Sequence, residues 1–443
     1  MAFGNFVKRL LGGGDTVTIS DDPFGSGKAL PITAVPEPEP PKREAGILVQ
    51  REEIIDGRAR IAGYRFVARR LGGGVPPPAP AAVAALRNDK LAAFGERRLA
   101  LIPLTAEDWQ AADFRQLVAP HATFLLASPA RGERDAWHLV LDEVKAAGGR
   151  LALDSGSIDD DAALAHADLL LLDFPAYSLE AFEHLVKSLA ASRPQLPLLA
   201  DGIGSWTEHR LCQSMGVRYS LGGFAATADE EDKGEKLNQS RLVLIEMLNL
   251  LRREADSSEI AAVAKRDPGV AVKVVGMANS PLSGLSAPVA SLEQALLVLG
   301  RATLYRWLSL AMFRSGNGGG RDEALLELAL YRARFLELLA TGSRAKPECD
   351  ELFLVGLLSL LDSLLGMPMA QVVNRMHLPP AVADVLLRNE GPYGRFLMLA
   401  LVMEKDYGDR AARIAAELGI EPDRLDECST RARAWAEEAL LAN

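Results

Sequence analysis

The stretch "ILVQREEIIDGRARIAGYRFVARR" at residues 47–70 contains two apolar runs joined by a short polar segment. Both runs are rich in β-branched and aromatic residues, and Asp56-Gly57 between them is typical of a β-hairpin turn. In the second run, alternation places Arg65 on the same face as Ile61 and Val67. The stretch therefore predicts a hairpin that carries a cation within an apolar strand, and this cation needs a physical reason.

The hairpin is the first part of a longer β/α pattern. Helical segments fill most of the later gaps between apolar runs, and "RLALD" and "DLLLLDF" are apolar on both faces, as parallel strands covered by helices must be. This pattern predicts an α/β barrel of TIM type with an antiparallel first hairpin, whose functional groups lie at the C-terminal strand ends. The eight predicted runs are 47–54, 61–67, 98–103, 122–127, 150–154, 169–173, 197–200 and 217–221.

The chain has 443 residues, too many for one ordinary core, and its composition changes along its length. Residues 1–45 are rich in Pro, Gly and acidic groups, which predicts a flexible N-terminal tail and a Pro-rich linker. We assign residues 46–228 to the barrel and 229–240 to a charged linker. Residues 241–443 have a helical period throughout and predict an all-α domain.

Composition excludes several classes of function. A net charge of −10 disfavours binding to nucleic acid phosphates, and every Leu-rich segment is interrupted by charges, which argues against stable membrane insertion. The three cysteines lie far apart without a CxxC spacing, which fits a reducing compartment and excludes a thiolate zinc site. We therefore expect a cytoplasmic protein.

The hairpin, with Gly63, Tyr64 and the trailing Arg69, resembles the beginning of the EAL domain in two-domain EAL-HDOD bacterial signalling proteins. This resemblance implies a relation to phosphodiesterases that cleave cyclic di-GMP with two divalent metal ions. In the alignment, the metal-binding Glu of the Glu-Ala-Leu signature falls on Arg65. Because such ions require oxygen ligands, a cation here replaces a ligand that the metals need.

Other positions that the resemblance assigns to the EAL site also differ from the family. The expected Asn, second Asp, Lys, catalytic Glu and Gln fall on Pro103, Ser155, Leu171, Gly204 and Leu221. The acidic groups that remain are Asp154, Asp173 and Asp201, which we interpret as strand-end caps or hydrogen-bonding groups, with one weak metal site as the alternative. The losses predict a degenerate EAL domain that is not an enzyme and holds no metal or other cofactor.

In the helical half, Asp267, Pro268, Asn279, Ser280, Ser291 and Gly300 are among the positions that carry a resemblance to the HDOD domain. HDOD domains are related to metal-dependent HD phosphohydrolases but lack their ligands, and none of the six histidines here is followed by Asp. Only His377 lies in the helical half, so a histidine-rich metal cluster is not expected there.

These features predict a bacterial signal-transduction regulator or scaffold that works through protein–protein contacts with other signalling proteins. Whether it acts as a homodimer stays open. One alternative is a metal-independent receptor for cyclic di-GMP or another nucleotide that relays binding to the HDOD domain. A second alternative is a surviving phosphodiesterase, which predicts product formation that depends on magnesium or manganese.

Overall fold

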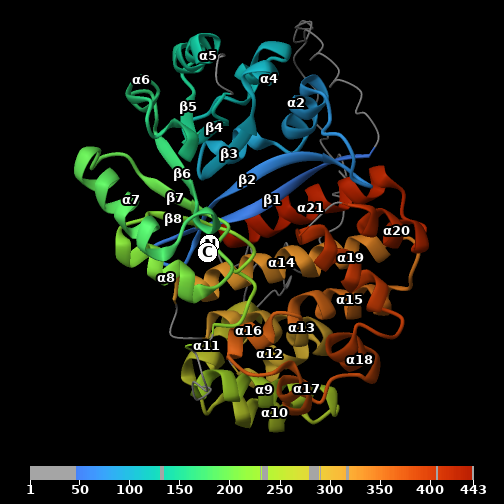
Figure 1. The fold of residues 1–443 in the computed structure, drawn as a ribbon. Helices are drawn as coiled ribbons and strands as arrows, with labels where there is room; N and C mark the ends of the chain where they lie inside the picture. The colour runs from blue at the N-terminus through green and yellow to red at the C-terminus, as the bar shows by residue number, and fades with distance from the viewer. Residues whose placement is uncertain are drawn as a thin grey trace, which may run out of the picture.

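The computed structural model describes residues 46–129, 134–229, 231, 238–278, 289, 291–315, 319–405 and 408–441. A closed eight-stranded barrel forms the first half, and helices form the second half (Figure 1). The predicted fold class is confirmed. The predicted tail at 1–45 and most of the predicted linker at 229–240 lie outside the described residues.

The barrel has the predicted strand order. β1 pairs antiparallel with β2 and with β8, whereas all other neighbouring strands are parallel. Every predicted run contains a strand, although β2 continues to Arg70. The strands are β1 (Ile47–Asp56), β2 (Ile61–Arg70), β3 (Leu99–Leu104), β4 (Ala122–Leu126), β5 (Arg150–Asp154), β6 (Leu169–Asp173), β7 (Leu198–Asp201) and β8 (Tyr219–Leu221).

The hairpin turn forms at the predicted place, but a side-chain interaction of Asp56 shapes it instead of the conformation of Gly57. The Asp56 carboxylate accepts hydrogen bonds from the backbone N–H groups of Arg58 and Arg60, at 2.9 and 3.0 Å. The left-handed residue of the loop is Ala59, with φ of +61°, and not Gly57. The local preference of an Asp side chain for nearby backbone donors therefore decides this turn.

Short helices connect the parallel strands and cover the outside of the barrel (Figure 1). A separate apolar cluster fills the inside, to which Ile54, Leu101, Leu171, Leu199 and Leu221 all contribute. The α-helices and the 3₁₀ turns (η) are α2 (Ala79–Asn88), α3 (Leu91–Gly95), α4 (Ala106–Ala111), η1 (Phe114–Leu117), α5 (Arg134–Ala146), η2 (Ser155–Ser157), α6 (Asp161–Leu164), η3 (Phe174–Ala176), α7 (Leu179–Ser192) and α8 (Trp206–Met215).

From residue 238 onward, the described part of the chain consists of helices joined by turns and short loops. Its helices are α9 (Gln239–Arg252), α10 (Ser257–Ala264), α11 (Pro268–Ala278), α12 (Leu292–Leu299), α13 (Arg301–Arg314), α14 (Gly320–Ala340), α15 (Lys346–Leu358), α16 (Leu361–Leu365), α17 (Met369–Met376), α18 (Pro380–Arg388), α19 (Gly394–Lys405), α20 (Asp409–Glu417) and α21 (Pro422–Leu441). Within the described ranges, none of these helices alone has the length and apolar character of a membrane span; α12 and α13 pass such a test only as a pair bent by 109°.

The two halves pack against each other along the hairpin. α14 contacts β2, and α19 and α21 contact β1, while α2 covers the other part of the same strands (Figure 1). One continuous cluster of buried apolar residues runs from the outer layer of the barrel into the helical half. Because no helix separates β1 from β2 in the sequence, the helical half supplies part of the cover that these strands need.

Candidate functional site

Arg65, the position at which the EAL resemblance expects a metal ligand, forms two ion pairs. It projects from β2 into the barrel, where its Nη1 contacts Asp201 Oδ2 at 2.6 Å and its Nε donates to Glu52. All three side chains keep about a fifth of their surface exposed, at 22% each. Burial by itself lowers the pKa of Arg65, but attraction to Glu52 and Asp201 outweighs it and raises that pKa above its ordinary value.

The strand register explains this ion-pair cluster. Glu52 on β1 lies directly opposite Arg65 on β2, so the two side chains share the inner face. Asp201 ends β7, which is separated from β2 by β8 and β1 in the barrel order. The guanidinium therefore reaches across the inside of the barrel, and its planar group of donors can serve both carboxylates.

The other acidic positions have different local partners. Asp154 accepts hydrogen bonds from the backbone N–H of Ser128, at 3.0 Å, and of Gly156, at 3.1 Å, and caps the start of η2, whose first residue is Ser155. Asp173 ends β6 beside Asp201, is exposed, and makes no side-chain cap on η3. The structure thus brings Asp173 next to Asp201, whereas Asp154 turns to a neighbouring loop.

The remaining positions that the resemblance assigns to the EAL site carry no charged group. Leu171 and Leu221 belong to the inner apolar cluster and are 7% and 0% exposed. Pro103 is exposed near the end of β3. The Gly204 N–H donates to Glu208 at 2.7 Å, just before α8. Among the residues that the structure describes, no group of three His, Cys, Asp or Glu side chains is arranged to hold a metal ion.

The predicted HDOD positions that are described lie at helix ends. Asp267 accepts from the backbone N–H groups of Gly269 and Val270, at 2.8 and 3.1 Å, and Ser240 of α9 donates to it. The Ser240 hydrogen bond, supported by those backbone donors, lowers the pKa of Asp267. Pro268 is the first residue of α11. These residues fix the contact between α9 and α11, which is a packing role.

Two other HDOD positions, Ser291 and Gly300, lie at the two ends of α12. Ser291 Oγ caps α12 by accepting from Gln294 N at 3.1 Å. Gly300, at a φ of +73°, ends α12 and allows the sharp bend into α13. Asn279 and Ser280 lie outside the described residues.

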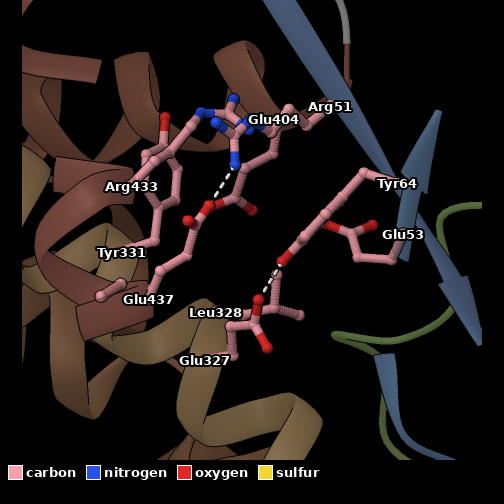
Figure 2. A pocket seen from close by; sticks show the side chains of 10 residues that line it. Arg51, Glu53, Tyr64, Glu327, Leu328, Tyr331, Glu404, Arg433 and Glu437 are labelled. Atoms are coloured by element: carbon pink, nitrogen blue, oxygen red, sulfur yellow. Dashed lines mark hydrogen bonds and ion pairs between the residues drawn. The ribbon is translucent and has the colours of Figure 1, made fainter. Parts of the chain in front are cut away.

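A second polar site, which sequence reasoning missed, lies between the barrel and the helical half. Figure 2 shows Glu53 and Tyr64 of the hairpin facing Glu327 of α14, with Arg433 and Glu437 of α21 nearby. Tyr64 Oη donates to Glu327 Oε1 at 2.6 Å. These residues line a small cavity of about 30 Å³, which is enough space for about two water molecules.

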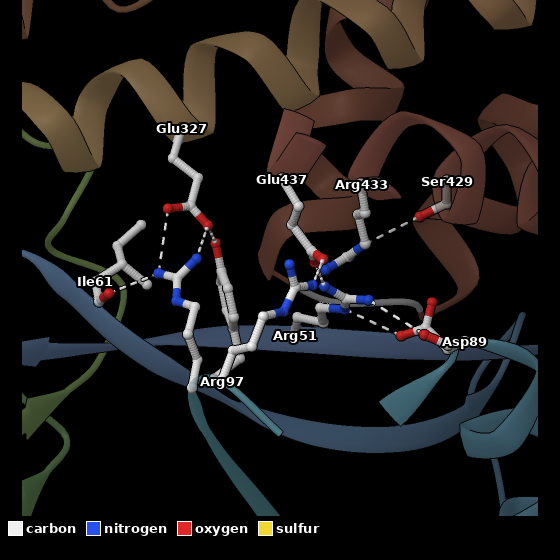
Figure 3. A network of polar contacts seen from close by, with 10 residues as sticks. Arg51, Ile61, Asp89, Arg97, Glu327, Ser429, Arg433 and Glu437 are labelled. Carbon is white, nitrogen blue, oxygen red and sulfur yellow. Dashed lines mark hydrogen bonds and ion pairs between the residues drawn. The ribbon is translucent and has the colours of Figure 1, made fainter. Parts of the chain in front are cut away.

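Two arginines of the barrel half, Arg51 and Arg98, form ion pairs with the helical half at this interface. Figure 3 shows Arg51 between Asp89, which follows α2, and Glu437 of α21. Arg98, just before β3, contacts Glu327 at 2.8 Å and donates to the Ile61 carbonyl oxygen at 2.6 Å. The sequence contained one indication of this site, because "QREE" at 50–53 places charged residues within an apolar strand. One of their partners, Glu437, lies 386 positions away from Arg51.

Burial also changes the acidity of Glu53 at this interface. Loss of hydration raises the pKa of its carboxyl group to about 7, and the negative charges of Glu404 and Glu52 act in the same direction. A backbone hydrogen bond and Arg433 oppose the change. The protonation of Glu53 therefore changes near neutral pH.

A comparison with known protein families finds a match in the helical half. The HDOD domain family model matches residues 239–373. Cyclic di-GMP phosphodiesterase CdgJ of Vibrio cholerae is 24% identical over 276 residues, covering 62% of this chain and 63% of its own length. The uncharacterized protein YuxH of Bacillus subtilis is 24% identical over 310 residues, covering 68% of this chain and 74% of its own.

The chain thus spans less than two thirds of the length of CdgJ. Among solved structures, the manganese and cyclic di-GMP complex of Klebsiella pneumoniae BlrP1 is similar at 17% identity, with a TM-score of 0.32 over 40% of this chain and 54% of that one. The HDOD match begins at α9 and ends within α17, so α18–α21 lie beyond it. The predicted two-domain EAL-HDOD architecture is thus supported: residues 239–373 match the HDOD domain, and a closed eight-stranded barrel precedes them.

Proposed function

We propose that this chain is a non-catalytic regulator in bacterial cyclic di-GMP signalling and acts through contacts with other signalling proteins. The observation that carries the proposal is the ion-pair cluster of Arg65 with Glu52 and Asp201. A dinuclear metal site needs carboxylates that are free to neutralise the metals. Here the Arg65 guanidinium already forms ion pairs with two of the carboxylates at the barrel mouth.

Electrostatics opposes a divalent ion at this place. A unit positive charge and a doubly charged ion about 4 Å apart repel each other by roughly 8 kcal/mol at an effective dielectric constant of about 20. Displacing Arg65 would require breaking its two ion pairs, and an arginine does not lose its proton in proteins. The residues present therefore do not fit the two metals of an EAL phosphodiesterase.

The surrounding residues support the same proposal. Leu171 and Leu221 pack inside the barrel, where the resemblance expects Lys and Gln, and Pro103 offers no side-chain oxygen. CdgJ carries the name of a phosphodiesterase, but identity to it is 24%. The three cysteines are free and buried, which supports a cytoplasmic location. No cofactor is part of the proposal.

A turnover assay tests the absence of catalysis. Purified full-length protein is incubated with cyclic di-GMP and either manganese or magnesium, and the linear product is measured by chromatography. We expect no product above the protein-free blank. Product that requires the metal and disappears with chelator would overturn the proposal. Capture of partners from the native bacterium, with full-length protein as bait, tests the second part; recovery of no specific partner counts against a scaffold.

A nucleotide receptor is the second candidate, and one observation favours it. Arg65 keeps 22% of its side chain exposed at the barrel mouth, and a guanidinium suits a phosphate group. Such a ligand has to compete with Glu52 and Asp201 for the same donors. Calorimetry with cyclic di-GMP separates the candidates: micromolar binding that is lost in Arg65→Met supports a receptor, whereas the absence of binding supports a scaffold.

A further inference from the structure

The β1–β2 hairpin has two faces with different partners. On the inner face, Glu52 and Arg65 are paired across the strands, and Arg65 also contacts Asp201. On the outer face, Tyr64, the residue next to Arg65, contacts the helical half through Glu327. Successive residues of one strand point in opposite directions, so a single strand touches both the barrel mouth and α14.

The outer contact is buried and polar, which makes its geometry demanding. Glu327 is 7% exposed and accepts from Tyr64 at 2.6 Å and from Arg98 at 2.8 Å. If either donor moves, a buried carboxylate loses a partner, and such a loss is costly. Figures 2 and 3 show Glu327 on α14 pointing at the hairpin. The position of β2 and the packing of α14 are therefore linked.

The strand itself has little freedom to absorb a local displacement. A Cβ atom placed on Gly63 would lie 1.9 Å from the carbonyl oxygen of Leu99, so β2 and β3 are in very close contact two residues before Arg65. Phe66 is 1% exposed and packs against Phe94, with ring centroids 5.2 Å apart. Close packing on both sides of the strand transmits a shift instead of damping it.

We propose that the hairpin couples the barrel mouth to α14: an event that draws Arg65 away from Glu52 and Asp201 weakens the Tyr64–Glu327 contact and loosens α14. The chemical class of ligand that does this is an anion, such as a phosphate-bearing molecule, that competes for the guanidinium. By linkage, loosening α14 also weakens the Arg65 cluster. The coupling goes beyond the proposed function, because it holds whether or not the barrel hydrolyses a substrate.

Hydrogen exchange of the full-length protein, followed by mass spectrometry, measures the coupling. The test variant is Arg65→Gln. The matched control is Arg193→Gln, because Arg193 also pairs with one aspartate, Asp161, and has a similar exposed fraction of 27%, but lies after α7. We expect amides of α14 around Glu327 to exchange about fivefold faster in the test variant, the lower end of typical allosteric coupling, and to stay unchanged in the control.

The same test in a Tyr64→Phe variant separates coupling from general destabilisation. Tyr64→Phe removes the hydroxyl group that contacts Glu327. If the hairpin transmits the effect through this contact, adding Arg65→Gln to Tyr64→Phe leaves α14 exchange nearly unchanged. A full additional fivefold increase in that background overturns the proposal. Faster exchange throughout the barrel helix α7 with no excess in α14 overturns it as well.

The reverse experiment keeps the proposal testable if Arg65→Gln does not fold. Glu327→Gln is made in the helical half, and exchange is measured at Gly202, whose N–H donates to Asp201 at 2.8 Å. We expect faster exchange at Gly202 in this variant than in wild type. Unchanged exchange at Gly202, together with faster exchange in α14, shows that the two sites are independent and refutes the coupling.

Discussion

Glu53→Gln provides a sharp test of the interface between the two halves. Glu53 lies opposite Tyr64 in the hairpin and faces Glu404 of α19 and Arg433 of α21. Burial raises the pKa of its carboxyl group from 4.5 to about 7. The folded protein therefore holds a proton on Glu53 over a pH range in which the unfolded chain has already released it.

The sign and the size of the effect follow from linkage. A raised pKa in the folded state contributes stability that is complete below about pH 4.5 and is lost as the pH rises through about 7. Between about pH 5.5 and pH 8.5 this loss amounts to roughly 2 kcal/mol. Gln does not titrate. The free energy of unfolding of Glu53→Gln, relative to that of wild type, should therefore rise by about 2 kcal/mol between pH 5.5 and pH 8.5.

The assay is urea unfolding at pH 5.5 and at pH 8.5, at constant ionic strength, followed by circular dichroism. Glu96→Gln, the same change at an exposed residue after α3, is the matched control and should track wild type at both values. The reasoning is refuted if the free-energy difference between Glu53→Gln and wild type is the same at the two pH values. It is also refuted if the control shifts equally.

Three further substitutions test the site and the fold, each by urea unfolding. Arg65→Met leaves two partly buried carboxylates without their shared cation and should cost about 1–3 kcal/mol at pH 7; no loss would mean that the cluster contributes nothing. Gly63→Ala should cost more than about 2 kcal/mol, because the Leu99 carbonyl blocks a Cβ atom, while Gly223→Ala, with open space, should be nearly neutral. Asp267→Ala removes a helix cap and should cost about 1 kcal/mol; since the pKa of Asp267 is lowered, the cost should shrink as the pH falls through that pKa, and a constant cost would contradict this.

Much of the barrel could be predicted from the sequence because its determinants are local. Apolar runs such as "RLALD" and "DLLLLDF" predict strands that are buried on both faces. The two strands formed there, β5 and β6, end at Asp154 and Asp173. The hairpin turn depends on hydrogen bonds between Asp56 and backbone groups at most four residues away. The bend at Gly300 follows from the conformational freedom of glycine.

The partners of the charged residues could not be predicted in this way. The sequence identified Arg65 as out of place, but its contact with Asp201 spans 136 positions and exists only after the barrel closes. The contact between Tyr64 and Glu327 spans 263 positions, and nothing in the local pattern of either residue indicates the other. Polar residues on the outer face of β1 gave a weak indication of an interface without naming its partner.

The sequence by itself determined the eight strands, their helical covers and the presence of a cation where the resemblance expects a metal ligand. Only the tertiary structure decided that this cation bridges Glu52 and Asp201, and that the same hairpin meets α14 and α21. The physical reason is range. Secondary structure follows from preferences between residues a few positions apart, whereas ion pairs inside a barrel or between two halves depend on register and closure, which place distant residues together.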